Sequence, residues 1–95
     1  MAFAVVAQYQ CAPADADTVR GALRTMRELV RSEPANLAYE AHEVVDQPGA
    51  FVLYERYTDR AGFEAHKETE HFAELIRATV FPLLKERTIT FAETL

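Results

Sequence analysis

NLAYEAHEVVDQPGAFVLYERY, from Asn36 to Tyr57, contains two β-strand patterns joined by a turn. Residues 51–57 are rich in aromatic and β-branched side chains, and residues 36–45 carry Tyr39, Val44 and Val45, a composition that favours strands. Between them lies Asp46-Gln47-Pro48-Gly49, a group of residues typical of turns. The segment therefore predicts a β-hairpin, and the sequence on either side decides which sheet this hairpin joins.

The sequence before the hairpin predicts a strand followed by a helix. Residues 2–11 form the strand, and Asp15 or Asp17 is placed to cap the helix. We expect Pro34 to end this helix, because a proline disfavours the helical conformation of the residue before it. One helix face is apolar, with Val19, Leu23, Met26 and Val30 at helical spacing. The opposite face carries a row of arginines that suits a solvated surface or an anionic substrate: Arg20, Arg24, Arg27 and Arg31.

The sequence after the hairpin predicts a divided helix and a last strand. A short helix is expected from Thr58 or Asp59 to about Glu68, and a second helical stretch over residues 70–84, kinked or shortened by Pro82. Residues 88–92 predict the final strand. The order β-α-β-β-α-β predicts one α+β domain over residues 1–95. Its fold class is ferredoxin-like, a four-stranded antiparallel sheet with helices on one face.

The second face of this sheet is expected to be covered. The first strand is apolar on both sides, and the strand over 51–57 places Val52, Tyr54 and Arg56 opposite its core-facing residues. A sheet with helices on one face should be polar on the other. We therefore expect a second copy of the chain to cover this face, giving a homodimer.

Composition excludes several classes of partner. The net charge is −5 and there is no basic run, which argues against nucleic acid and anionic membranes. The single cysteine, Cys11, fits a reducing cytoplasm, and the apolar start lacks the positive region of a signal peptide. No glycine-rich phosphate loop or metal motif occurs, so we expect no cofactor and no metal.

Glu55 and His66 are the candidate catalytic residues. Glu55 shares a strand face with Phe51, Leu53 and Tyr57, so its carboxylate is buried and its pKa is expected to rise. It could serve as an acid or base or hold a substrate hydroxyl, or it could form a structural ion pair. His66 follows Phe63 by three residues, on the same helix face. It could accept a proton near neutral pH or bond to a backbone carbonyl in the core.

Further polar residues have both structural and functional interpretations. His71 could be a half-exposed residue at the junction of the two helical pieces. His42 and Tyr39 could simply pack on the sheet, and Asn36 could shape a turn. A tyrosine or asparagine near a cavity can also bind a phenolic oxygen. His66 and His71 with Glu40 or Glu55 would make a two-histidine, one-carboxylate metal set, but their spacing matches no known motif.

Three segments resemble the antibiotic biosynthesis monooxygenase family. Residues 33–42, EPANLAYEAH, are similar to the family's E-P-G-x-x-x-Y segment, and 51–57, FVLYERY, to its F-x-x-x-E-x-W strand. Residues 63–66, FEAH, with His71-Phe72 resemble its histidine-containing helix region. The resemblance spans nearly the whole chain. Two residues depart from the pattern, since Ala35 stands in place of glycine and Tyr57 in place of tryptophan.

The resemblance implies a dimeric α+β barrel with a pocket between sheet and helices. Family members oxidise quinols, anthrones and other electron-rich aromatics with O2 and no cofactor. Carried onto this chain, the pattern implies Glu55 and His66 as catalytic residues. It implies a substrate-binding group of Asn36, Tyr39, His42, Tyr57, His71 and Phe72. Haem-degrading relatives depend on the tryptophan that Tyr57 replaces, which argues against haem breakdown here.

Three functions remain open from the sequence. The first is a cofactor-independent monooxygenase in which His66 removes a phenolic proton from a quinol or anthrone substrate and O2 then reacts with the anion. The second is an isomerase that moves protons without oxygen. The third is a small-molecule-binding or stress-response domain. A family resemblance alone does not decide among them, because one fold can support several activities.

Overall fold

The predicted hairpin forms β2 (Asn36–Glu43) and β3 (Ala50–Tyr57) in a computed structural model that describes residues 1–95. Asp46 and Gly49 in the connecting turn have φ values of 60° and 86°. Glycine is required at position 49 for two reasons. Its φ is positive, and a Cβ there would overlap the Cys11 carbonyl oxygen. The Cys11 amide donates to the Gly49 carbonyl at 2.9 Å, which fastens the turn to the neighbouring strand.

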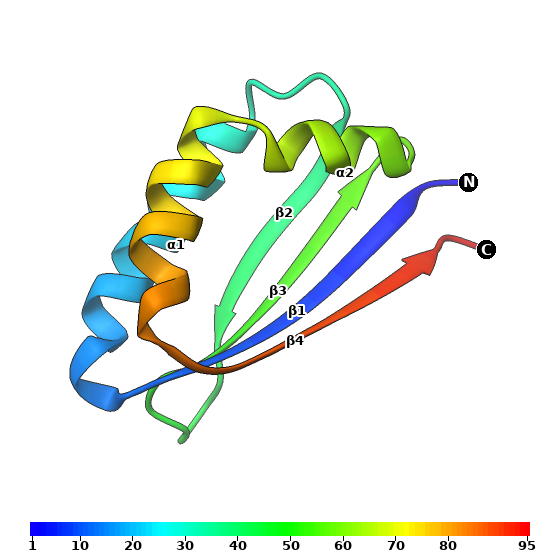
Figure 1. The fold of residues 1–95 in the computed structure, drawn as a ribbon. Helices are drawn as coiled ribbons and strands as arrows, with labels where there is room; N and C mark the ends of the chain where they lie inside the picture. Colours follow the sequence, from blue (N-terminus) through cyan, green and yellow to red (C-terminus); the bar gives the residue numbers. More distant parts are fainter.

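The sheet has the strand order β2-β3-β1-β4, with all neighbours antiparallel (Figure 1). β1 (Phe3–Cys11) lies in the middle and β4 (Leu84–Glu93) forms the far edge. β4 begins four residues before the predicted start at 88, because pairing with β1 extends it through a bulge opposite Gln10 and Cys11. The two ends of the chain lie side by side, since the Thr94 amide donates to the Ala2 carbonyl at 3.0 Å.

The first helix is α1 (Ala16–Val30), preceded by the short 3-10 turn η1 (Pro13–Asp15). Its buried face includes Val19, Leu23, Met26 and Val30, as predicted. The predicted aspartate cap does not form. Asp15 stands at the capping position, but its backbone is already helical and its side chain makes no capping bond. A capping side chain reaches back to the helix only from an extended backbone.

The second helical region is divided, as predicted, and its pieces differ in geometry. α2 (Arg60–Lys67) is α-helical and is capped by the Asp59 carboxylate, which accepts from the Gly62 amide at 2.8 Å. The π-helical segment η2 (Phe72–Val80) follows, and the 3-10 turn η3 (Phe81–Leu83), which contains Pro82, leads into β4. None of the helices combines the length and apolar character needed to cross a membrane.

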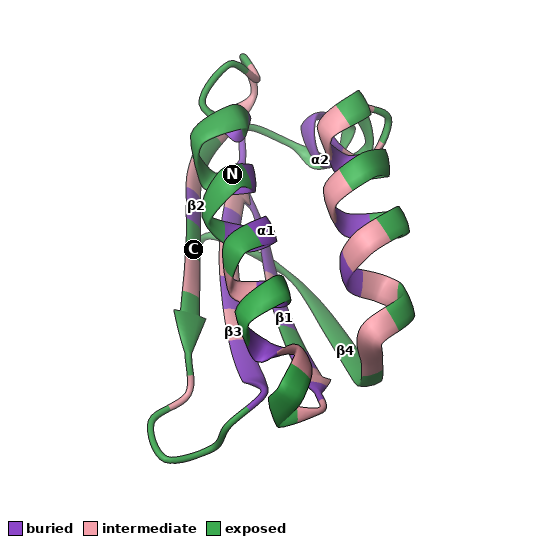
Figure 2. Ribbon diagram, turned by 90° about the vertical axis from the view of Figure 1, so that its left-hand side faces the viewer, coloured by how far each residue is buried: buried purple, intermediate pink, exposed green.

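The main core lies between the sheet and the pair formed by α1 and η2 (Figure 2). A smaller cluster of Phe3, Val5, Tyr57 and Phe63 lies under α2. Together these elements give the predicted α+β, ferredoxin-like fold with its helices on one face of the sheet. The region between the two clusters is where Glu55 and His66 meet.

The other face of the sheet carries no helix and is less apolar than the sequence suggested. An apolar stripe follows β1 and β3 through Ala4, Val6, Val52 and Tyr54, and all but Ala4 are partly exposed. Polar residues lie on both sides of the stripe, because the outer strands carry Glu40, His42, Thr88 and Thr90 on this face. The side-chain Nε of Arg56, next to the stripe, is buried without a hydrogen-bond partner.

Candidate active site

Glu55 lies in the middle of β3, on the face that the helices cover. Its neighbours across the sheet are Val5 on β1 and Tyr39 on β2, and only 5% of its surface is exposed. The Tyr57 hydroxyl donates to Glu55 Oε1 at 2.7 Å. Burial raises the pKa of this carboxyl above its ordinary value, against the smaller opposing effects of Tyr57 and His66. The structure therefore confirms that the Glu55 carboxyl is buried.

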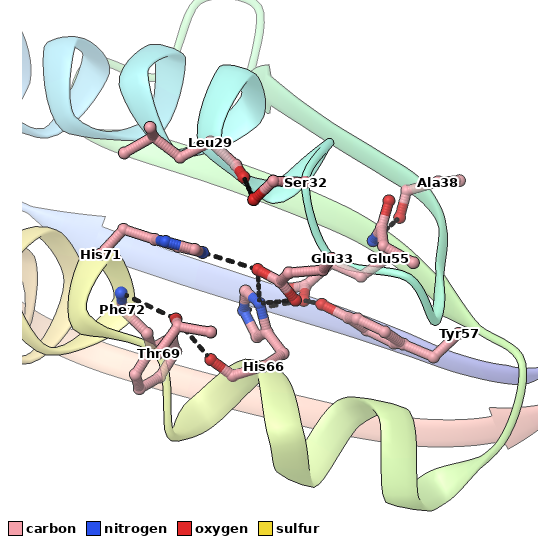
Figure 3. Close-up of polar contacts among 11 residues, drawn as sticks. Leu29, Ser32, Glu33, Ala38, Glu55, Tyr57, His66, Thr69, His71 and Phe72 are labelled. Carbon is pink, nitrogen blue, oxygen red and sulfur yellow. Dashed lines mark hydrogen bonds and ion pairs between the residues drawn. The ribbon is translucent and has the colours of Figure 1, made fainter.

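His66 lies in the last turn of α2 and is 2% exposed. Its Nδ1 is 3.0 Å from each carboxylate oxygen of Glu33, and its Nε2 is 3.7 Å from Glu55 Oε1 (Figure 3). A ring nitrogen within hydrogen-bond distance of two carboxylate oxygens is their donor, so Nε2 is the nitrogen that faces Glu55. The imidazole thus stands between two carboxyl groups.

Glu33 is the site residue that sequence reasoning missed. It lies in the connection after α1, and its Oε2 also accepts a hydrogen bond from His71 Nε2 at 2.7 Å. Burial would raise the pKa of Glu33, but the hydrogen bonds from His66 and His71 outweigh burial and lower it. The sequence interpretation placed Glu33 at the end of a helix and in the EPANLAYEAH segment but gave it no role in the site. The signal that could have found Glu33 was its place in the EPANLAY segment.

Three tyrosines surround Glu55, and all remain protonated. Burial raises the pKa of Tyr9, Tyr39 and Tyr57, and the nearby charge of Glu55 raises each further. Tyr57 already donates to Glu55, and the Tyr39 ring lies 6.0 Å from the His66 ring between centroids. Neutral hydroxyls of this kind are hydrogen-bond donors for a charged oxygen.

Glu55 opens onto an aromatic cavity of about 330 Å³ between the sheet and the helical segments α2 and η2. Its oxygen Oε1 is bonded to Tyr57, whereas Oε2 makes no hydrogen bond within the chain. His66 is not among the lining residues but lies behind them, with its ring centroid 5.2 Å from that of Phe72. The cavity is lined by Ala7, Tyr9, Glu55, Phe63, Lys67, Phe72, Arg77, Phe81, Arg87, Ile89 and Phe91.

The structure brings together only part of the predicted site. Glu55 and Phe72 line the cavity, Tyr57 bonds to Glu55, and His66 and His71 bond to Glu33. Tyr39 packs against the His66 ring from the sheet side. The remaining two expected substrate-binding residues, Asn36 and His42, lie elsewhere.

Asn36 and His42 do not reach this cavity. The Asn36 amide donates to the Ala38 carbonyl at 3.0 Å, which holds the bulge at the start of β2. His42 is exposed on the other side of the sheet, 3.6 Å from the Glu40 carboxylate. Side chains alternate between the two faces along β2, and this places His42 on the uncovered face. The substrate-binding role that the resemblance implied for His42 therefore does not fit its position.

Glu33, His66 and His71 are also the residues that could hold a metal ion. One ligand atom from each lies within 4.8 Å of the others, and two imidazoles with a carboxylate suit divalent transition metals. The sequence paired these histidines with Glu40 or Glu55, whereas the structure places Glu33 there. The hydrogen bonds among the three side chains account for their proximity without an ion.

Comparison with known proteins gives a consistent result. The family model for antibiotic biosynthesis monooxygenase matches residues 2–78. A crystal structure of an antibiotic biosynthesis monooxygenase is 31% identical, with a TM-score of 0.90 and 98% of each chain covered.

Two further solved structures have the same fold. Rv0793 from Mycobacterium tuberculosis is 29% identical, with a TM-score of 0.90 over 100% of this chain and 96% of that chain. PA3566 from Pseudomonas aeruginosa is 28% identical, with a TM-score of 0.89 over 99% and 94%. No curated protein matches the chain. Because the family model spans most of the sequence, this chain belongs to the antibiotic biosynthesis monooxygenase family.

Proposed function

We propose that this protein is a cofactor-independent monooxygenase of quinols, anthrones or related phenols. The observation that carries the proposal is the position of Glu55. Its carboxyl lines an aromatic cavity, its pKa is raised, and its oxygen Oε2 makes no hydrogen bond within the chain. A base of this kind removes a proton from a phenol or an activated methylene group more readily than an ordinary carboxylate does. Membership in the family supports the same chemistry.

In this proposal Glu55 is the catalytic residue and His66 is a positioning residue. Glu55 lines the cavity, whereas His66 lies behind Glu55, with Nε2 3.7 Å from Glu55 Oε1. The roles expected from the sequence, with His66 as the base that contacts the substrate and Glu55 supporting it, are therefore reversed. Glu55 accepts the substrate proton, and Glu33 holds the His66 ring so that Nε2 faces Glu55. The protonated Tyr9, which also lines the cavity, is the donor for the substrate oxyanion.

The substrate supplies the electrons for the oxygen step. Its anion gives one electron to O2, and the resulting radical and superoxide combine into a carbon–oxygen bond. The peroxide takes up a proton from Glu55 and loses water, which leaves a new carbonyl group. For an anthrone the balance is anthrone plus O2 to anthraquinone plus water, so no external reductant is consumed. The protein's part is to deprotonate, orient and exclude bulk water.

Oxygen uptake tests this proposal directly. Purified protein treated with a chelator is mixed with anthrone or naphthalene-1,4-diol in an oxygen electrode, and the uncatalysed oxidation is subtracted. We expect uptake that scales with protein concentration and is lost in Glu55→Gln. Substrate isomerisation that continues under argon would replace the proposal with the isomerase, and saturable binding with neither reaction would leave a binding domain.

We also propose that the protein functions as a homodimer through the uncovered sheet face. An apolar stripe bordered by polar residues is the usual composition of a protein interface. The unpartnered Nε of Arg56 lies beside this stripe, and a buried donor without an acceptor costs about 1–3 kcal/mol. A second copy is the occupant that removes both the exposed apolar area and the unsatisfied donor.

A further inference from the structure

Cationic side chains from three elements line the cavity that contains Glu55. Lys67 ends α2, Arg77 comes from η2 and Arg87 comes from β4. The two arginines are exposed, whereas Glu55 is buried. The cavity therefore has a carboxyl at its inner end and positive charge where it meets solvent. This is unexpected in a chain whose net charge is −5.

Both arginines are held against the walls of the cavity. Arg77 Cζ lies 5.2 Å from the centre of the Phe72 ring, and Arg87 Cζ lies 4.0 Å from the centre of the Phe81 ring. These distances are typical of cation–π contacts, which fix a guanidinium over a ring and leave its edge free. Phe72 and Phe81 contact each other edge to face, with centroids 6.1 Å apart. The two guanidiniums therefore stand on adjoining aromatic walls.

The charges of these arginines are not neutralised within the chain. Neither Arg77 nor Arg87 forms a salt bridge, whereas Lys67 is paired with Glu64 at 3.0 Å. Arg20 and Arg31 on α1 differ, since Arg20 is paired with Asp17 and Glu43, and Arg31 with Glu28. A guanidinium has a planar set of donors that matches the two oxygens of a carboxylate. The mouth of the cavity is thus equipped for an anion that the chain itself does not provide.

We infer that Arg77 and Arg87 form a carboxylate subsite, and that the substrate is an aromatic phenol with a carboxylate at the end opposite its reactive hydroxyl. The inference rests on the proposed function only in assigning the hydroxyl end of the substrate to Glu55. The hydroxyl end meets the buried carboxyl, the rings occupy the aromatic walls, and the carboxylate meets the two guanidiniums in solvent. A volume of about 330 Å³ is at the small end for ligand pockets, which suits fused aromatic rings.

A pair of ligands that differ only in charge tests the subsite. The probes are 6-hydroxy-2-naphthoate and its methyl ester, with dissociation constants from calorimetry at low and at high salt. We expect the acid to bind the wild type about tenfold more tightly than the ester at low salt. High salt should reduce this preference because it screens exposed charges. In the Arg77→Gln, Arg87→Gln double variant the acid should bind no better than the ester.

Arg24→Gln is the matched control, since Arg24 is an exposed arginine on α1 that lies outside the cavity. It should retain the full preference for the acid. Equal binding of acid and ester to the wild type would overturn the subsite, as would a preference that survives in the double variant. Oxygen uptake with neutral quinols in the same preparations would then still uphold the proposed function, so the two failures are distinct. If neither probe binds, the subsite is likewise overturned.

Discussion

Glu55 and Glu33 are the same residue type in opposite electrostatic settings, on either side of one imidazole. Burial raises the pKa of Glu55, whereas at Glu33 the effect of burial is outweighed by the combined interactions with His66 and His71, which lower the pKa. Such divergence separates a carboxyl that exchanges a proton from one that stays charged. Glu55 is therefore the member of the pair suited to proton transfer, and Glu33 the member suited to holding His66.

Replacing Glu55 by Gln should abolish most of the activity without unfolding the protein. The amide can still accept the hydrogen bond from Tyr57 but cannot take up a proton, so we expect turnover to fall about 10²-fold or more. Because the pKa of Glu55 is raised in the folded state, the folded protein loses stability as the pH rises from the ordinary pKa of 4.5 through the raised value. The variant should therefore be at least as stable as the wild type at neutral pH in urea unfolding, and a large loss of stability would contradict this account.

Variants of Glu33 and His66 should move the pH profile in opposite directions. The charge of Glu33 raises the pKa of Glu55, so Glu33→Gln should shift the acidic limb of kcat/KM to lower pH. His66 lowers that pKa, so His66→Ala should shift the limb to higher pH and reduce turnover at least about tenfold. A merely structural role would leave both limbs in place. Steady-state rates between pH 4 and 9 distinguish the two cases.

The sequence predicted the inward-facing site residues better than the others. Glu55 and His66 could be found because each is polar within an apolar pattern on a regular element. Glu33 could not be placed, because its contacts with His66 and His71 join residues 33 and 38 positions apart. Asn36 and His42 came from the resemblance. Strand geometry directs His42 to the uncovered face, whereas the Asn36 amide is used at the bulge of β2, where it donates to the Ala38 carbonyl.

At the level of elements, the position of α2 is set by close contact at Gly62. A Cβ on Gly62 would come within 2.6 Å of the Ala35 Cβ, on the connection that also carries Glu33. Gly62→Ala should therefore displace α2 and His66, cost about 1–3 kcal/mol of unfolding free energy, and lower turnover. Gly21 in α1 has no neighbour within 4 Å of such an atom. Gly21→Ala should instead stabilise the protein by about 0.5–1 kcal/mol with unchanged turnover, as measured by urea unfolding and rate assays.

The elements themselves were predictable to the extent that they are amphipathic. The spacing of Val19, Leu23 and Met26 identified α1, and runs of apolar, β-branched and aromatic residues bounded by turn residues identified β1 and β3. The start of β4 was missed because residues 84–87 lack a strand pattern and are ordered by pairing with β1. The π-helical geometry of η2 was missed because its apolar spacing matches that of an α-helix.

For the whole molecule, the uncovered sheet face predicts self-association. Tyr54→Glu places a charge in the apolar stripe and should convert the protein to monomers in sedimentation velocity at micromolar concentration. Leu29→Glu is the matched change at an apolar residue of α1 that is 41% exposed, and it should leave association unchanged. Circular dichroism controls for folding of both variants. A wild type that sediments as a monomer would contradict the proposed homodimer.

The contact between Thr94 and Ala2 means that the strands could be connected in a different order while they pair in the same way. Because the start of β1 and the end of β4 are hydrogen-bonded to each other, a short linker between residues 95 and 1 would close the backbone into a ring. That ring can be reopened in the exposed turn between Asp46 and Gln47, away from Glu33, Glu55 and His66. A circularly permuted chain that starts at Gln47 should therefore keep the same sheet and the same cavity.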